Sequence, residues 1–105
     1  MEDSAAPFVS VVAAADLPPG KAIEALVNGK PVALFNVGGE FHAISNTCVH
    51  RGGPLGKGVL DGKLVLCPWH AWAYDVTTGT SDVNPDLKVA RYEVKVEDGQ
   101  VLVRA

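Results

Sequence analysis

The sequence contains few cysteines, no cluster of basic residues and no long apolar segment, and each shortage excludes a class of protein. Two cysteines among 105 residues allow one disulfide at most, so the chain is not a disulfide-stabilised scaffold. Nine Lys and Arg residues stand against twelve Asp and Glu without any basic run, which argues against nucleic-acid binding. The N-terminus is acidic where a secretory signal would be basic, and the first apolar run, at 8–15, is too short to span a bilayer. The sequence therefore predicts a cytoplasmic protein that binds neither nucleic acid nor membranes.

Helical periodicity is also scarce, whereas short runs of β-branched and apolar residues bounded by Gly, Pro, Asn and Asp recur along the chain. We therefore expect one all-β domain built from several small antiparallel sheets. The predicted strands are 8–13, 22–27, 31–37, 40–45, 64–67, 72–75, 90–97 and 100–104. The dipeptides Asn28-Gly29, Gly38-Gly39 and Asp98-Gly99 separate pairs of these strands and favour the positive φ of tight hairpin turns.

Two short pairs of metal-ligating residues occur in irregular segments of the chain. Cys48 and His50 are spaced by one residue, and Cys67 and His70 follow with a spacing of two. Thiolate sulfur and imidazole nitrogen both bind iron and zinc, and closely spaced pairs can direct their side chains at one centre. Two neighbouring loops would thus supply four ligands.

This pattern, with its flanking sequences NTCVHRGGPL and CPWHAWAYD, resembles the motif of Rieske 2Fe-2S proteins. The hairpins before the motif and the strands after it resemble the rest of a Rieske ferredoxin, so nearly the whole chain is covered. The resemblance implies one 2Fe-2S cluster, with Cys48 and Cys67 on one iron and His50 and His70 on the other. It also implies that residues 1–105 form a single Rieske domain, in which a cluster-binding subdomain at about 46–86 is inserted into a basal β domain.

High-potential Rieske proteins carry an extra disulfide between the two ligand loops. The corresponding positions in this sequence are Gly53 and Trp69, and neither is a cysteine. The resemblance is therefore to the ferredoxins of oxygenase systems. It implies an electron-transfer protein, not an enzyme, that passes single electrons from a flavin-dependent reductase to a terminal oxygenase. Trp69 and Trp72 are expected to shield the cluster from water. His42, the remaining histidine, is expected to be structural or solvent-facing.

Three other interpretations of the sequence compete with that of a ferredoxin. A structural Cys2His2 zinc site would need the same four side chains, although the flanking motif favours the cluster. The small subunit of an assimilatory nitrite reductase would have the same fold. A catalytic Rieske oxygenase would need a further mononuclear iron site, for which this sequence lacks the histidines, and no Gly-x-Gly-x-x-Gly segment for a dinucleotide is present.

The sequence also predicts the reduction potential of such a cluster, because hydrogen bonds to its sulfurs favour the reduced form. A serine that donates in the high-potential group is replaced here by Trp72, whereas the tyrosine of that group is present as Tyr74. We expect a midpoint low in the Rieske range, roughly −150 to 0 mV. A redox titration followed by electron paramagnetic resonance (EPR) measures it, and a midpoint above about +100 mV would contradict the prediction.

Overall fold

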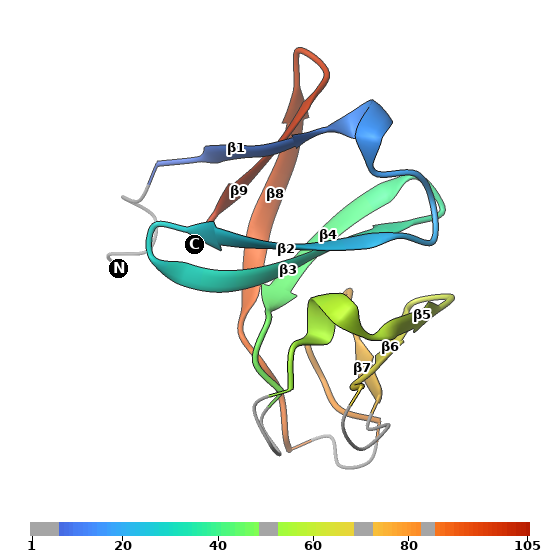
Figure 1. Ribbon diagram of the computed structural model, residues 1–105. Coiled ribbons are helices and arrows are strands. Elements are labelled where there is room, and N and C mark those ends of the chain that lie inside the picture. Colours follow the sequence, from blue (N-terminus) through green and yellow to red (C-terminus); the bar gives the residue numbers. More distant parts are fainter. Residues whose placement is uncertain (1–6, 49–52, 69–72, 83–85) are drawn as a thin grey trace.

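The computed structural model describes residues 7–48, 53–68, 73–82 and 86–105, and strands dominate this part of the chain (Figure 1). The elements are β1 (Val9–Ala13), η2 (Ala14–Asp16), β2 (Ala22–Val27), β3 (Lys30–Val37), β4 (Glu40–Ser45), η3 (Leu55–Lys57), β5 (Val59–Asp61), β6 (Leu64–Leu66), β7 (Ala73–Asp75), β8 (Arg91–Glu97) and β9 (Gln100–Arg104). The predicted all-β fold class is thus confirmed. Within the described ranges, no helix has the length and apolar character needed to cross a membrane.

The strands lie close to their predicted positions. β2, β4 and β9 have the predicted bounds, and β1, β3, β6 and β8 differ from prediction by one residue at one end. β7 begins at Ala73, and residue 72 lies outside the described residues. The short strand β5 was not predicted, because three residues between Gly58 and Gly62 give too little alternation to recognise.

The three predicted hairpin turns are confirmed by their backbone angles. Asn28 and Asp98 have φ of 51° and 53°, each is followed by a glycine with positive φ, and both glycines of the third turn also have positive φ. Asparagine and aspartate tolerate this left-handed conformation better than other residues with a side chain. The turns therefore fix the registers of β2 with β3 and of β8 with β9.

The strands form a six-stranded sheet, in the order β1-β9-β8-β4-β3-β2, and a three-stranded sheet, β5-β6-β7. The larger sheet consists of two halves joined through β4 and β8, which pair at Ala43–Tyr92 and Ile44–Arg91. The expected small sheets are therefore present, but two of them are linked by this short ladder. Figure 1 shows the three-stranded sheet and η3 below β2, β3 and β4.

Two hydrophobic cores lie on opposite faces of β3. Val32 and Leu34 face a basal core that also contains Val101 and Val103 of β9. The alternate residues of β3 face a second core shared with the three-stranded sheet. This second core comprises Ala33, Phe35, Ile44, Cys48, Leu55, Val65, Cys67, Tyr74, Val76 and Val89. Both cysteines thus lie where the smaller sheet packs against the larger one.

The turn that follows β7 is held by the side chain of Asp75. Its Oδ1 accepts hydrogen bonds from the Thr77 hydroxyl at 2.5 Å and the Thr77 amide at 2.9 Å, and its Oδ2 lies 3.2 Å from Lys63 Nζ. Burial by itself raises the pKa of Asp75, but the two Thr77 hydrogen bonds and the Lys63 ammonium outweigh it and hold the pKa below its usual value. The carboxylate therefore stabilises the turn when it is ionised.

We expect Asp75→Ala to lower the free energy of unfolding by about 2 kcal/mol near neutral pH, because two hydrogen bonds and an ion pair are lost. Asp75→Asn keeps an acceptor for Thr77 and loses only the charge, so its loss should be about 0.5 kcal/mol. Because the folded-state pKa is lowered, the carboxylate stabilises the protein above the unfolded-state pKa, and this contribution is lost as pH falls through the folded-state pKa.

Urea unfolding at neutral pH and at a series of acidic pH values measures both effects. The difference in stability between the wild type and Asp75→Ala should narrow toward acid. A difference that is constant or widens as pH falls would contradict the role given to the ionised carboxylate.

Candidate metal centre

Cys48 lies in a tight loop that leaves the end of β4. Its amide donates a hydrogen bond to the Gly53 carbonyl at 3.0 Å, and Thr47 and Pro54 form an antiparallel bridge next to it. The cysteine is only 2% exposed. The loop therefore turns the Cys48 side chain inward, toward the second core.

The base of this loop is closed by Asn46. The Asn46 carbonyl accepts the Leu55 amide at 2.8 Å, and its side-chain Oδ1 accepts the Gly56 amide at 2.7 Å. The Asn46 amide donates to the Pro31 carbonyl at 3.0 Å, which attaches the loop to β3. One asparagine thus connects the start of the loop, its end and the larger sheet.

Cys67 directly follows β6 and is also 2% exposed. The chain arrives there along β6, which pairs with β5 on one side and β7 on the other. A Cβ on Gly58 would collide with the carbonyl oxygen of Leu66, the residue before Cys67. Glycine at position 58 therefore allows the segment after η3 to pass close to the strand that carries the second cysteine.

Tyr74 connects the two cysteine-bearing segments. It lies on β7, opposite Val65 of β6, and is fully buried. Its hydroxyl oxygen lies 3.1 Å from Cys48 Sγ, a distance at which either group can donate a hydrogen bond. The Tyr74 hydroxyl is thus within hydrogen-bond distance of a predicted ligand sulfur, and its donation to that sulfur stays a prediction.

The surroundings of the two sulfurs suit a soft metal ion. Cys48 and Cys67 belong to the same buried cluster, among side chains such as Phe35, Ile44 and Leu55. Apolar surroundings destabilise an isolated thiolate, and a bound cation compensates that penalty. Thiolate ligands favour zinc and iron–sulfur centres over hard ions such as magnesium or calcium. These two residues therefore fit an iron–sulfur cluster.

Of the four predicted ligands, the structure places Cys48 and Cys67 in the same hydrophobic core, the second core. The other two, His50 and His70, lie outside the described residues, as do Trp69 and Trp72. Within the described ranges alone, no group of three or more His, Cys, Asp or Glu side chains could hold a metal ion. The assignment of the full ligand set to His50 and His70 therefore stays a prediction.

His42 does not belong to the hydrophobic core that contains the two cysteines. It is on β4 opposite Phe35, its side chain is 22% exposed, and its Nε2 lies 3.5 Å from Glu40 Oε1. This position is consistent with the structural role expected for it.

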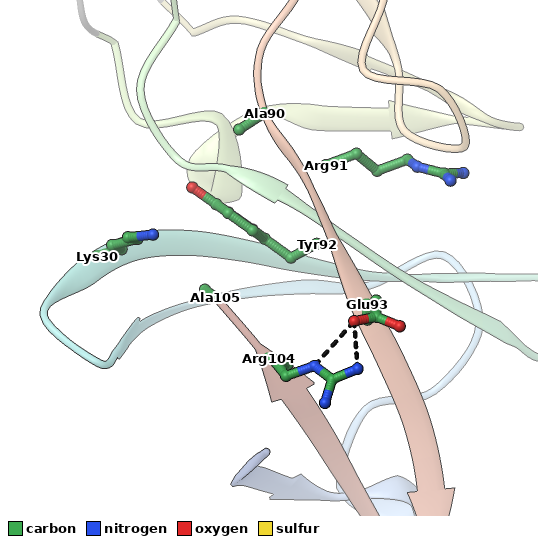
Figure 2. Close-up of a pocket in the computed structure, with 7 residues that line it drawn as sticks. All are labelled: Lys30, Ala90, Arg91, Tyr92, Glu93, Arg104 and Ala105. Atoms are coloured by element: carbon green, nitrogen blue, oxygen red, sulfur yellow. Dashed lines mark hydrogen bonds and ion pairs between the residues drawn. The ribbon is translucent and has the colours of Figure 1, made fainter. Parts of the chain in front are cut away.

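A surface pocket on the larger sheet contains neither cysteine (Figure 2). Its lining residues are Lys30, Ala90, Arg91, Tyr92, Glu93, Arg104 and Ala105. Arg104 donates two hydrogen bonds to Glu93 Oε1, at 2.6 and 2.8 Å, so its charge is balanced within the pocket. The pocket is therefore separate from the candidate metal centre.

Comparison with known proteins agrees with this site. Residues 7–97 match the family model of the Rieske [2Fe-2S] domain. The chain is 37% identical over 90 residues to the ferredoxin component of the naphthalene 1,2-dioxygenase/salicylate 5-hydroxylase systems of Ralstonia sp. That match covers 85% of this chain and 86% of the relative.

Solved structures give the same answer for the fold. A chain of the complex of reduced oxygenase and oxidized ferredoxin in carbazole 1,9a-dioxygenase superposes with a TM-score of 0.83 and 36% identity, over 90% of this chain and 99% of that one. A protein described as a putative NADH-dependent nitrite reductase small subunit from Mycobacterium tuberculosis superposes with a TM-score of 0.86 and 25% identity, over 93% and 94% of the two chains.

We expect Tyr74→Phe to keep the cluster and lower its midpoint potential, because the hydroxyl that contacts Cys48 Sγ is removed while the buried ring stays. A net hydrogen-bond contribution of about 1 kcal/mol corresponds to a shift of roughly 40 mV for one electron. Tyr92→Phe, on β8, is the matched control and should leave the midpoint unchanged. Equal midpoints for Tyr74→Phe and the wild type would contradict donation to the sulfur.

Proposed function

The chain belongs to the Rieske [2Fe-2S] family, and on this basis we propose that it is the ferredoxin component of an oxygenase system. It is a single-electron carrier with one 2Fe-2S cluster, and it passes electrons from a flavin-dependent reductase to a terminal oxygenase. The observation that carries this proposal is the match to a dioxygenase ferredoxin component over 85% of this chain and 86% of the relative. Docking with both partners is transient, as suits a carrier.

The ligands we propose are Cys48 and Cys67 for one iron and His50 and His70 for the other. When bound, the cluster supplies a site that gains and loses one electron, and its histidine-bound iron is the more easily reduced. The position of both cysteines in the second hydrophobic core supports the assignment of the two sulfur ligands. The spacing of the two Cys/His pairs in the sequence supports the histidine half.

The chain's own residues then have separate tasks. The apolar side chains of the second core exclude water from the sulfurs, which controls the local dielectric and hence the potential. An iron-bound Cys48 carries no proton, so the Tyr74 hydroxyl is the donor in the contact between them. The six-stranded sheet supports the Cys48 loop on strands whose registers are fixed by hairpin turns.

We further propose that residues of about 46–86 act as the cluster-binding subdomain of a single domain and that the protein is cytoplasmic. The first proposal is supported by the separate three-stranded sheet within that segment. The second is supported by the similarity to the ferredoxin component of the Ralstonia dioxygenase system.

A second candidate function is that of a nitrite reductase small subunit. The similarity to the mycobacterial protein, over more than nine-tenths of both chains, favours it. The two functions differ in how tightly the partner is bound. A carrier should be purified alone, whereas a subunit should be purified in a fixed ratio with a large siroheme-containing partner.

The proposal is tested by EPR, iron analysis and electron transfer in a reconstituted system. The reduced protein should show a Rieske signal and two irons per chain, and adding it to a reductase, NADH and a terminal oxygenase should support substrate turnover. His50→Ala and His70→Ala should lose the signal, whereas the matched control His42→Ala should keep it. A colourless zinc protein, or a signal that survives loss of either ligand histidine, would contradict the proposal.

A further inference from the structure

We propose that a hydrogen bond between Asn46 and Glu24 positions Cys48 and thereby tunes the potential and retention of the cluster. This inference rests on the proposed binding of iron by Cys48. Asn46 Nδ2 donates to Glu24 Oε2 at 2.7 Å, and this bond joins the base of the cysteine loop to β2. Both are positioning residues, because they act on the cluster through Cys48.

Asn46 is placed to transmit such an effect because it lies two residues before Cys48. Its Oδ1 accepts the Gly56 amide at 2.7 Å while its Nδ2 donates to Glu24, so both ends of the side-chain amide are used. The backbone carbonyl of Asn46 also accepts the Leu55 amide at 2.8 Å. A change in the Asn46 side chain would therefore move the start and the end of the loop together.

The packing at this point is close and specific. A Cβ on Gly56 would lie 2.6 Å from Glu24 Cγ and 3.0 Å from Asn46 Oδ1. Glycine at position 56 thus allows the Glu24 side chain to reach Asn46 beneath the loop. This close approach to β2 indicates that the contact with Glu24 is part of how the loop is built.

The charge of Glu24 strengthens the hydrogen bond. A donor to a carboxylate makes a stronger bond than a donor to a neutral acceptor, and the Glu24 side chain is 32% exposed, so solvent weakens the bond only in part. Lys57 Nζ lies 3.8 Å from Glu24 Oε1, but its side chain is 69% exposed. At such exposure the ion pair contributes little, and the Asn46 hydrogen bond is the interaction to test.

The proposed effect of Asn46 on the cluster is transmitted through Cys48 Sγ. Cys48 Sγ lies 3.1 Å from the Tyr74 hydroxyl, which comes from the other sheet. If the base of the loop shifts, this distance changes, and the hydrogen bond that stabilises the reduced cluster weakens. Glu24, on a strand with no predicted ligand, thus influences the redox centre.

The test uses three variants of the holoprotein. Asn46→Asp keeps an acceptor for the Gly56 amide but places a carboxylate against Glu24, so cluster loss should become about tenfold faster. Its EPR g values should shift and its midpoint should fall. In the double variant Asn46→Asp with Glu24→Gln, the introduced glutamine amide can donate to the introduced aspartate, and the net charge equals that of the wild type.

We expect the double variant to recover the wild-type g values, midpoint and rate of cluster loss to within about twofold. Glu24→Gln alone keeps an acceptor for Asn46 and should change the rate no more than about threefold. An Asn46→Asp variant with wild-type g values and midpoint would overturn the inference, and so would a double variant that shows no recovery. A wild-type protein without a Rieske signal would instead overturn the proposed function itself.

Discussion

The contact between the Tyr74 hydroxyl and Cys48 Sγ is the interaction on which the rest of the site depends, because it joins segments of the chain that belong to different sheets. Tyr74 belongs to the three-stranded sheet, and Cys48 extends from the six-stranded one. A hydrogen bond of 3.1 Å between them requires that the two sheets pack in one relative position. The second core supplies that packing, and Tyr74 is the largest fully buried side chain among its described residues.

The two hydrophobic cores on opposite faces of β3 explain how one short chain holds its two sheets in a fixed relative position. Buried residues on both faces of β3 give the larger sheet a core of its own, separate from the core around the cysteines. Among the described residues, the basal core is built from strands of the larger sheet together with Leu17 and Ala105, whereas both cysteines belong to the second core. Cys48 and Cys67 therefore lie next to a sheet that has its own stabilising core, which is the arrangement that a well-positioned metal centre needs.

Much of this fold could be predicted from the sequence, because its strands are short, β-branched and separated by turn residues with a defined backbone conformation. The dipeptides Asn28-Gly29 and Asp98-Gly99 are examples in which two residues between predicted strands indicated a positive φ. The pairing of β4 with β8 could not be predicted, because it involves two residue pairs between segments far apart in the chain. The same holds for the site. The Cys/His spacing and Tyr74 could be recognised in the motif, whereas Glu24 and Asn46, separated by 22 residues, meet only because β3 pairs with both β2 and β4.

The arrangement also suits the proposed sulfur ligands of a one-electron carrier, because both lie in the second core. Gain of an electron adds negative charge, and nearby water or mobile side chains would have to reorient each time the charge changes. Cys48 and Cys67 are each 2% exposed and are surrounded by close-packed apolar groups that have little polarity to reorient. The Tyr74 hydroxyl lies 3.1 Å from Cys48 Sγ, so a dipole beside this proposed ligand is already in place when the cluster gains an electron. The same rigidity would make the potential sensitive to small movements of Cys48, which is why we propose that the hydrogen bonds of Asn46 belong to the redox site.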